Sequence, residues 1–171
     1  MNTHATLRIT PSPVNPWLAL AGWIALCAIA GAIGAVASVE AKQFYATLEQ
    51  PAWAPPAGVF GPVWTLLYMS MAWAAWLVWR ERGFARARGA LGLFIVQLAF
   101  NALWSWLFFG WHRGALAFAD ILVLLALIVA TIVAFARIRK AAAWLLAPYL
   151  AWVSFATALS YSVWQRNPHA L

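Results

Sequence analysis

The sequence predicts an all-α integral membrane protein, a bundle of five transmembrane helices that forms one domain. Of the 171 residues, 65% are hydrophobic and 9% are charged, whereas about a quarter of the residues in a soluble domain are charged. The mean hydropathy is +0.79. The apolar residues also gather into five long runs, each of a length that crosses the hydrocarbon core of a bilayer as a helix.

Each expected span is an apolar run bounded by charged or turn-forming residues. The first run could instead be a cleaved signal peptide, because Arg8 precedes it and small residues lie near Ala35 and Ala37. It is longer than a usual signal-peptide core, so we expect a retained span. Residues 1–16 and 165–171 are expected to be tails. The expected spans are residues 17–39, 62–79, 90–109, 115–136 and 141–164.

Lysine and arginine are unevenly divided between the two sides of this bundle, with eight on the side of the amino terminus and three on the other. Cytoplasmic loops are enriched in these residues. We therefore expect a cytoplasmic amino terminus, with the carboxyl terminus and residues 40–61 on the opposite side. Orientation also explains the net charge of +7 without a nucleic-acid partner. The eight are Arg8, Arg80, Arg82, Arg86, Arg88, Arg137, Arg139 and Lys140, and the three are Lys42, Arg113 and Arg166.

Residues 40–61, which we name the Pro/Trp loop, lead into an apolar stretch that is poorly suited to a regular helix. From Gln50 to Tyr68 the chain has four prolines, two glycines and no charge. Each proline removes an N–H donor and fixes φ, which lowers the cost of irregular backbone beside lipid. Pro62 suits the first turn of the helix that follows. We expect a stiff aromatic loop that covers an apolar site.

The 13 tryptophans have two explanations. Those near span ends fit a belt at the membrane interface: Trp17, Trp79, Trp111, Trp144 and Trp164. Five lie deeper, where they either pack, face lipid or line a ligand pocket: Trp73, Trp76, Trp104, Trp106 and Trp152. Among these we favour a pocket for Trp104 and Trp152.

Helical spacing groups further aromatic and polar residues on common faces. The sets are Trp64 with Tyr68; Gln97, Asn101 and Ser105 beside Trp104; and Trp152, Ala156 and Leu159. Polar side chains at membrane depth face protein or a cavity and not lipid. Gln97 and Asn101 therefore either form hydrogen bonds between helices or provide polar anchor points in an aromatic pocket.

Several strings of residues occur together in a specific order. They are Pro51-x-Trp53-x-Pro55-Pro56, Gly61-Pro62-Val63-Trp64-Thr65-x-x-Tyr68, Gln97-Leu98-Ala99-Phe100-Asn101-x-x-Trp104, Phe108-Phe109-Gly110 and Pro148-Tyr149-Leu150-Ala151-Trp152. From roughly Phe44 to Trp164 the chain thus resembles the TspO/MBR family, also called the translocator-protein or tryptophan-rich sensory protein family. The resemblance implies a five-helix protein of a bacterial membrane, inner or outer, with a ligand site beneath its first loop.

The resemblance also implies the ligand class and the residues of the site. The ligands would be tetrapyrroles such as protoporphyrin and haem, and sterol-like molecules, with no obligatory cofactor. Many members have a second tryptophan where Gly58 stands and an asparagine where Ser160 stands, which bears on the ligand range and on the fit of the loop. The matching residues are Tyr45, Trp53, Trp64, Asn101, Trp104, Trp152, Ala156 and Leu159, to which spacing adds Tyr68.

Three classes of function follow, and we favour a binding or sensory protein, which needs only a pocket and a lid. A transporter would need a path to both faces of the membrane. A porphyrin-degrading enzyme would use Trp64 and Trp152 in a light-dependent reaction, by resemblance to family members credited with it. Small residues that open and line the third span also predict a homodimer, as in the family: Gly89, Ala90, Gly92, Ala99 and Ala102.

Two weaker features have ordinary explanations. The spacing Leu159-x-Tyr161-x-x-x-x-Arg166 fits a short sterol-contact pattern, but an ordinary helix end with an aromatic belt explains it as well. Asp120 is the one acidic residue inside an expected span. We expect it to be shallow and either paired or hydrated, near His112 and Arg113.

The sequence contains no constellation typical of metal or nucleophilic chemistry. The three histidines lie outside the expected spans, so paired axial ligands for a membrane-buried haem are lacking. We find no cluster of cysteines and histidines, no nucleophile–base–acid set and no phosphate loop in the sequence.

Overall fold

The computed structural model describes residues 15–171 and is all-helical there, which confirms the predicted fold class. Asn15 caps the first helix, where its side-chain oxygen accepts a hydrogen bond from the Trp17 amide (2.9 Å). The expected tail lies outside the described residues except for Asn15 and Pro16, and Pro16 already belongs to the helix. The elements are α1 (Pro16–Ala37), α2 (Ala41–Thr47), η1 (Ala57–Val59), α3 (Phe60–Ser105), η2 (Trp106–Gly110), α4 (Gly114–Ala136), α5 (Lys140–Leu145) and α6 (Ala147–Arg166).

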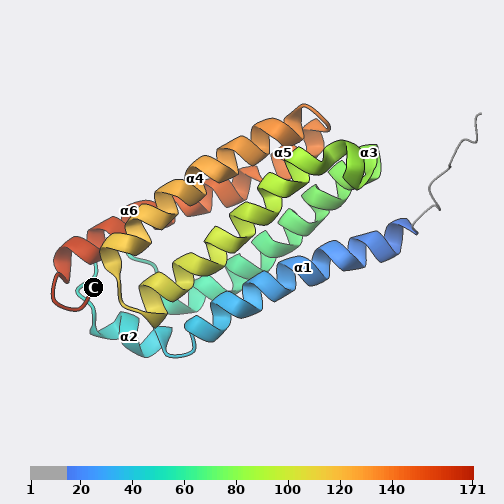
Figure 1. Cartoon of the computed structure of the whole chain (residues 1–171). Coiled ribbons are helices and arrows are strands. Elements are labelled where there is room, and N and C mark those ends of the chain that lie inside the picture. Colours follow the sequence, from blue (N-terminus) through green and yellow to red (C-terminus); the bar gives the residue numbers. More distant parts are fainter. Residues whose placement is uncertain (1–14) are drawn as a thin grey trace, which may run out of the picture.

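The element α3 supplies two antiparallel limbs, residues 60–82 and 84–105, because the chain reverses at Gly83 (Figure 1). Gly83 has φ 67° and ψ 170°, a conformation that a side chain would strain. The sequence predicts a basic loop over residues 80–89, and the structure instead forms helix on both sides of this single glycine. The arginines of the segment therefore project from helix ends.

The fifth expected span, residues 141–164, is divided into two helices, since α5 ends at Leu145 and α6 begins at Ala147. Pro148 lies in the first turn of α6, where its missing N–H donor costs least. The break leaves the Leu145 carbonyl free of the helix pattern, and the Ser70 hydroxyl donates a hydrogen bond to it (2.6 Å). This hydrogen bond connects the junction of α5 and α6 to the first limb of α3.

At the opposite end of the bundle, the Pro/Trp loop lies beside the carboxyl terminus (Figure 1). The sequence predicts irregular backbone here, and the structure adds the short helix α2 before the proline-rich part. Asn167 holds the loop, because its side chain accepts from the Glu49 amide (2.8 Å) and donates to the Glu49 carbonyl (3.0 Å). Arg166 also pairs with the Glu49 carboxylate at 3.3 Å.

The bundle interior is packed with small and aromatic side chains. Ala72, Ala74 and Ala75 on the first limb of α3 are fully buried, which lets neighbouring helices approach closely, as in membrane bundles. Large apolar side chains cover much of the outside. Within residues 15–171, four helical stretches are long and apolar enough to cross a membrane, and the one containing α3 turns back at Gly83 to give five crossings.

Candidate functional site

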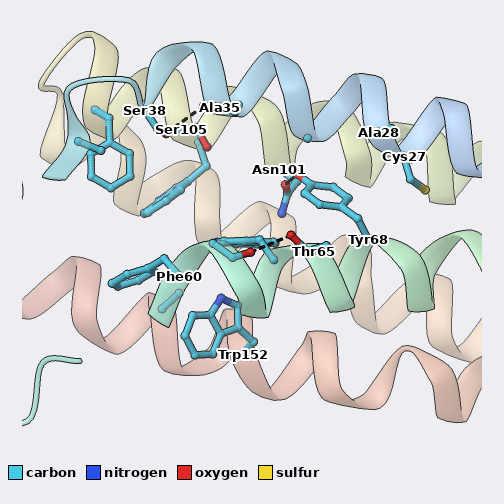
Figure 2. Close-up of a pocket in the computed structure, with 18 of the residues that line it drawn as sticks. Cys27, Ala28, Ala35, Ser38, Phe60, Thr65, Tyr68, Asn101, Ser105 and Trp152 are labelled. Carbon is cyan, nitrogen blue, oxygen red and sulfur yellow. Dashed lines mark hydrogen bonds between the residues drawn. The ribbon is translucent and has the colours of Figure 1, made fainter. Parts of the chain in front are cut away.

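A cavity of about 600 Å³ lies in the half of the bundle nearest the Pro/Trp loop. Residues of α1, α2, α3 and α6 line it, and Figure 2 shows their side chains converging on one space. Its volume falls in the range of about 300–1,000 Å³ that is typical of ligand pockets. The aromatic residues around it are Tyr45, Phe60, Trp64, Tyr68, Trp104, Phe109 and Trp152.

The aromatic rings hold one another in place. Trp64 contacts Tyr68 one turn along the same helix, with ring centroids 5.7 Å apart. Phe60 packs edge-on against Trp152 of α6 at 5.8 Å. Trp104 stacks on Phe108 at 5.2 Å. Because such pairs have preferred geometries, the walls present preformed flat apolar surfaces.

The wall formed by α1 is made of small side chains. Gly31 and Gly34 both line the cavity. A Cβ atom on Gly31 would lie 3.0 Å from the Tyr68 ring, and one on Gly34 would lie 3.1 Å from the Ser105 hydroxyl. Glycine at these positions therefore lets α1 approach α3 closely.

The cavity opens to the outside between α1 and the first limb of α3. Four residues line the cavity and are also exposed on the outer surface of the bundle: Ala28 and Ala35 on α1, and Thr65 and Met69 on α3. Figure 2 shows Ala28, Ala35 and Thr65 on the two helices that border this space. A ligand therefore has a lateral route into the site.

A chain of hydrogen bonds forms the inner end of the cavity. The Tyr68 hydroxyl donates to the Asn101 side-chain oxygen (2.6 Å), and the Asn101 amide donates to the Tyr149 hydroxyl (3.1 Å). Tyr149 in turn donates to the Gln97 side-chain oxygen (2.7 Å). Gln97 and Asn101 thus both form hydrogen bonds between helices. Of the two, Asn101 also lines the cavity.

Three hydrogen-bond donors of the cavity residues have no partner within residues 15–171. They are the Tyr45 hydroxyl and the indole N–H groups of Trp104 and Trp152, all buried. Burial raises the pKa of Tyr45, so its phenol stays protonated and able to donate at neutral pH. An unpaired buried polar group costs roughly 1–3 kcal/mol. A ligand that carries hydrogen-bond acceptors would offset this cost.

The structure brings most of the sequence-predicted site residues together and leaves two apart. The seven that line the cavity are Tyr45, Trp64, Tyr68, Asn101, Trp104, Trp152 and Ala156. Trp53 is 51% exposed and packs against Phe155, with centroids 5.7 Å apart. Leu159 is buried in a separate apolar cluster with Phe108 and Val163. Neither Trp53 nor Leu159 lines the cavity.

The residues of the short sterol-contact pattern do not share a surface. Leu159 points into the bundle, while Tyr161 is exposed and packs against Phe118. Arg166 pairs with Glu49 of the Pro/Trp loop. These contacts support the alternative of an ordinary helix end.

Asp120 is buried, and one of its carboxylate oxygens, Oδ2, has no hydrogen-bond partner within residues 15–171. The two ion pairs among those residues, Arg139 with Glu81 and Arg166 with Glu49, do not include it. Of the two expected alternatives, pairing or hydration, an ion pair with His112 or Arg113 is therefore absent from the described part of the chain.

Sequence reasoning missed Tyr149 and the contribution of α1. Tyr149 is 1% exposed and connects Asn101 to Gln97, although it stands in one of the strings that suggest the family. The small residues of α1 carry no chemical signal of their own. The available indication was the pair Gly31 and Gly34 in the first span, because small residues let membrane helices approach closely.

Comparison with known proteins identifies the family of the chain. The TspO/MBR family model matches residues 23–165, which include both limbs of α3, all but the last residue of α6, and every residue that lines the cavity. The chain belongs to the TspO/MBR family. It is therefore a multi-pass integral membrane protein, and the lateral opening lies between two helices that are long and apolar enough to cross the membrane.

Relatives from several kingdoms share most of their length with this TspO/MBR chain. The translocator protein of Homo sapiens is 43% identical over 130 residues, which cover 75% of this chain and 77% of that protein. The tryptophan-rich protein TspO of Chlorobaculum tepidum is 40% identical over 156 residues, or 88% and 97% of the two chains. The tryptophan-rich sensory protein of Cereibacter sphaeroides is 35% identical over 151 residues, or 88% and 92%.

Proposed function

We propose that this TspO/MBR protein binds flat hydrophobic ligands, namely tetrapyrroles such as protoporphyrin and haem and also sterol-like molecules, in a sensory or regulatory role. The observation that carries the proposal is the cavity of about 600 Å³ with seven aromatic side chains around it. Each aromatic contact with a flat ligand contributes about 0.5–1.5 kcal/mol beyond the burial of apolar area. Several such contacts in one site favour ring systems over acyl chains.

Packing below the cavity supports binding or sensing over transport. Toward the Gly83 turn, the interior is closed by buried side chains that include Met71, Phe94 and Tyr149. A transporter needs a path to both faces of the membrane. In this conformation the cavity reaches the surface of the protein at its side and at its loop end. Flux of protoporphyrin into protein-containing liposomes, absent from empty ones, would favour transport instead.

Quenching of tryptophan fluorescence tests the proposal. Protoporphyrin, haem and a sterol are titrated into the detergent-solubilised protein and into the variants Trp152→Leu and Trp144→Leu. Trp144 is 76% exposed on α5, away from the cavity, so its loss should leave ligand affinity unchanged. Saturable quenching that weakens in Trp152→Leu alone is expected. Equal affinity in both variants for every ligand would move the site elsewhere.

Light-dependent porphyrin breakdown is the alternative function, and one observation favours it. Both Trp64 and Trp152, the residues that such a reaction would use, line the same cavity. Illumination of the porphyrin-bound protein should then give a product that neither Trp64→Phe nor Trp152→Phe forms. Identical bleaching in the wild type and both variants would exclude a role for these side chains.

We also propose a homodimer that uses the second limb of α3. Of the small residues expected at this interface, Ala90 and Ala102 are buried within the chain and pack its own bundle. Gly89 and Ala99 are exposed, and Gly92 is half-buried. An exposed row of small residues allows close approach of a second helix in lipid.

A further inference from the structure

The charges around the cavity are unevenly placed. Among the described residues that line it, Lys42 is the single charged one, and there is no acidic residue. Lys42 lies on α2, at the loop end of the cavity, and is exposed. Neither of the two ion pairs within residues 15–171 includes it. The nearby Glu40 lines a different cavity, under the other side of α2.

Tyr45 places a second polar group at the same end. It follows Lys42 by three residues, so the two side chains share one face of α2. Tyr45 is nine-tenths buried, its ring packs edge-on against Phe60 at 5.9 Å, and its hydroxyl has no partner among residues 15–171. The loop end of the cavity therefore offers a cation and an unused O–H donor from one short helix.

The rest of the cavity has the opposite character. Its inner end is closed by the Tyr68–Asn101–Tyr149 hydrogen bonds, which already use the Tyr68 donor and the Asn101 oxygen. A carboxylate placed there would lack a counter-charge and would be costly to bury. At α2 it would lie near the membrane surface, where the exposed Lys42 ammonium and water both stabilise it.

We propose that Lys42 and Tyr45 form a carboxylate subsite, so that the preferred ligand is a flat hydrophobic acid. Its ring system lies against Trp64, Trp104 and Trp152, and its carboxylate lies at α2. The inference rests on the proposed function and deepens it, because it separates acidic ring systems from neutral sterols. The two buried indole N–H groups remain for weaker acceptors on the ring.

The test compares protoporphyrin IX with its dimethyl ester, which keeps the ring and removes both charges. Affinities are measured for the full chain in nanodiscs of phosphatidylcholine, for the wild type and for Lys42→Met, Tyr45→Phe and Lys140→Met. Lys140 is an exposed lysine at the opposite end of the bundle, so it controls for the loss of one positive charge. Retention of helical content by circular dichroism verifies the fold of each variant.

Lys42→Met should weaken binding of the diacid about 3- to 5-fold, because it removes an ion pair that is partly exposed to water. The affinity for the ester should stay unchanged. Tyr45→Phe should weaken the diacid roughly tenfold, because it removes a hydrogen bond to a charged group. Lys140→Met should change neither ligand. Added salt should reduce the affinity of the wild type for the diacid and not for the ester.

Two results separate failure of the subsite from failure of the function. If both porphyrins bind but Lys42→Met and Lys140→Met bind the diacid equally, the carboxylate subsite is overturned and the proposed function stands. If neither porphyrin binds the wild type, the proposed function fails and the subsite fails with it. Parallel loss of diacid and ester in Lys42→Met would also overturn the subsite, because the effect would not depend on charge.

Discussion

Replacement of Tyr149 by phenylalanine removes one hydroxyl from the centre of the bundle. This hydroxyl donates to Gln97 (2.7 Å) and accepts from Asn101 (3.1 Å), and the side chain is 1% exposed. The variant keeps the ring and its packing. It leaves the Gln97 oxygen and one Asn101 N–H group buried without a partner.

The expected loss of stability lies between two limits. Each buried polar group left unpaired costs about 1–3 kcal/mol in soluble proteins, whereas interhelical hydrogen bonds in a membrane protein contribute about 0.6 kcal/mol on average. We expect Tyr149→Phe to lower the free energy of unfolding by about 1–2 kcal/mol. For a chain of this size, that corresponds to a fall in melting temperature of roughly 2–8 °C.

Thermal unfolding in detergent, followed by circular dichroism, measures this effect. The control is Tyr161→Phe, since Tyr161 is 48% exposed on the outside of α6. The control should unfold within about 0.5 kcal/mol of the wild type. Equal melting temperatures for the two variants would refute the idea that the hydrogen-bond chain stabilises the bundle.

Three further predictions address ligand contacts, orientation and assembly. Trp152→Leu should weaken all flat ligands by a similar factor, whereas Asn101→Ala should reorder a panel of porphyrins according to their polar groups; a uniform loss in both variants would contradict separate roles. In a cysteine-free background, a cysteine within residues 50–59 should react with an impermeant reagent from outside the cell, and one within residues 80–89 should not; the reverse pattern would invert the expected orientation. Ala99→Phe, at an exposed position of α3, should shift the solubilised protein toward monomer; unchanged crosslinking would place the interface elsewhere.

Helical periodicity and composition predicted the five-helix fold, because a long apolar run in a membrane protein has few alternatives to a helix. The same reasoning placed Trp64 and Tyr68 on one face, where they now contact each other. It did not show which faces of different helices meet. Leu159 follows Trp152 at helical spacing, yet Phe108 and Val163 surround it in another cluster.

Local backbone details were also out of reach of the sequence. A run of arginines with two glycines suggested a loop, but Gly83 alone makes the turn and the arginines are helical. In the sequence, Tyr149 is only a residue close to Trp152. In the structure, its hydroxyl forms hydrogen bonds with Gln97 and Asn101 on the second limb of α3. Such contacts depend on the relative rotation and depth of two helices, which a single sequence does not specify.

The central claim, that flat ligands occupy the cavity beneath the Pro/Trp loop, is tested most directly by filling that cavity. Ala156 lines it one turn after Trp152, whereas Ala158 lies on the outer face of α6. Protoporphyrin affinity is measured for Ala156→Phe and Ala158→Phe, with retained helical content as the check on folding. The account predicts at least about a tenfold loss in Ala156→Phe, equivalent to roughly 1.4 kcal/mol, and wild-type affinity in Ala158→Phe. Wild-type affinity in both folded variants would contradict it.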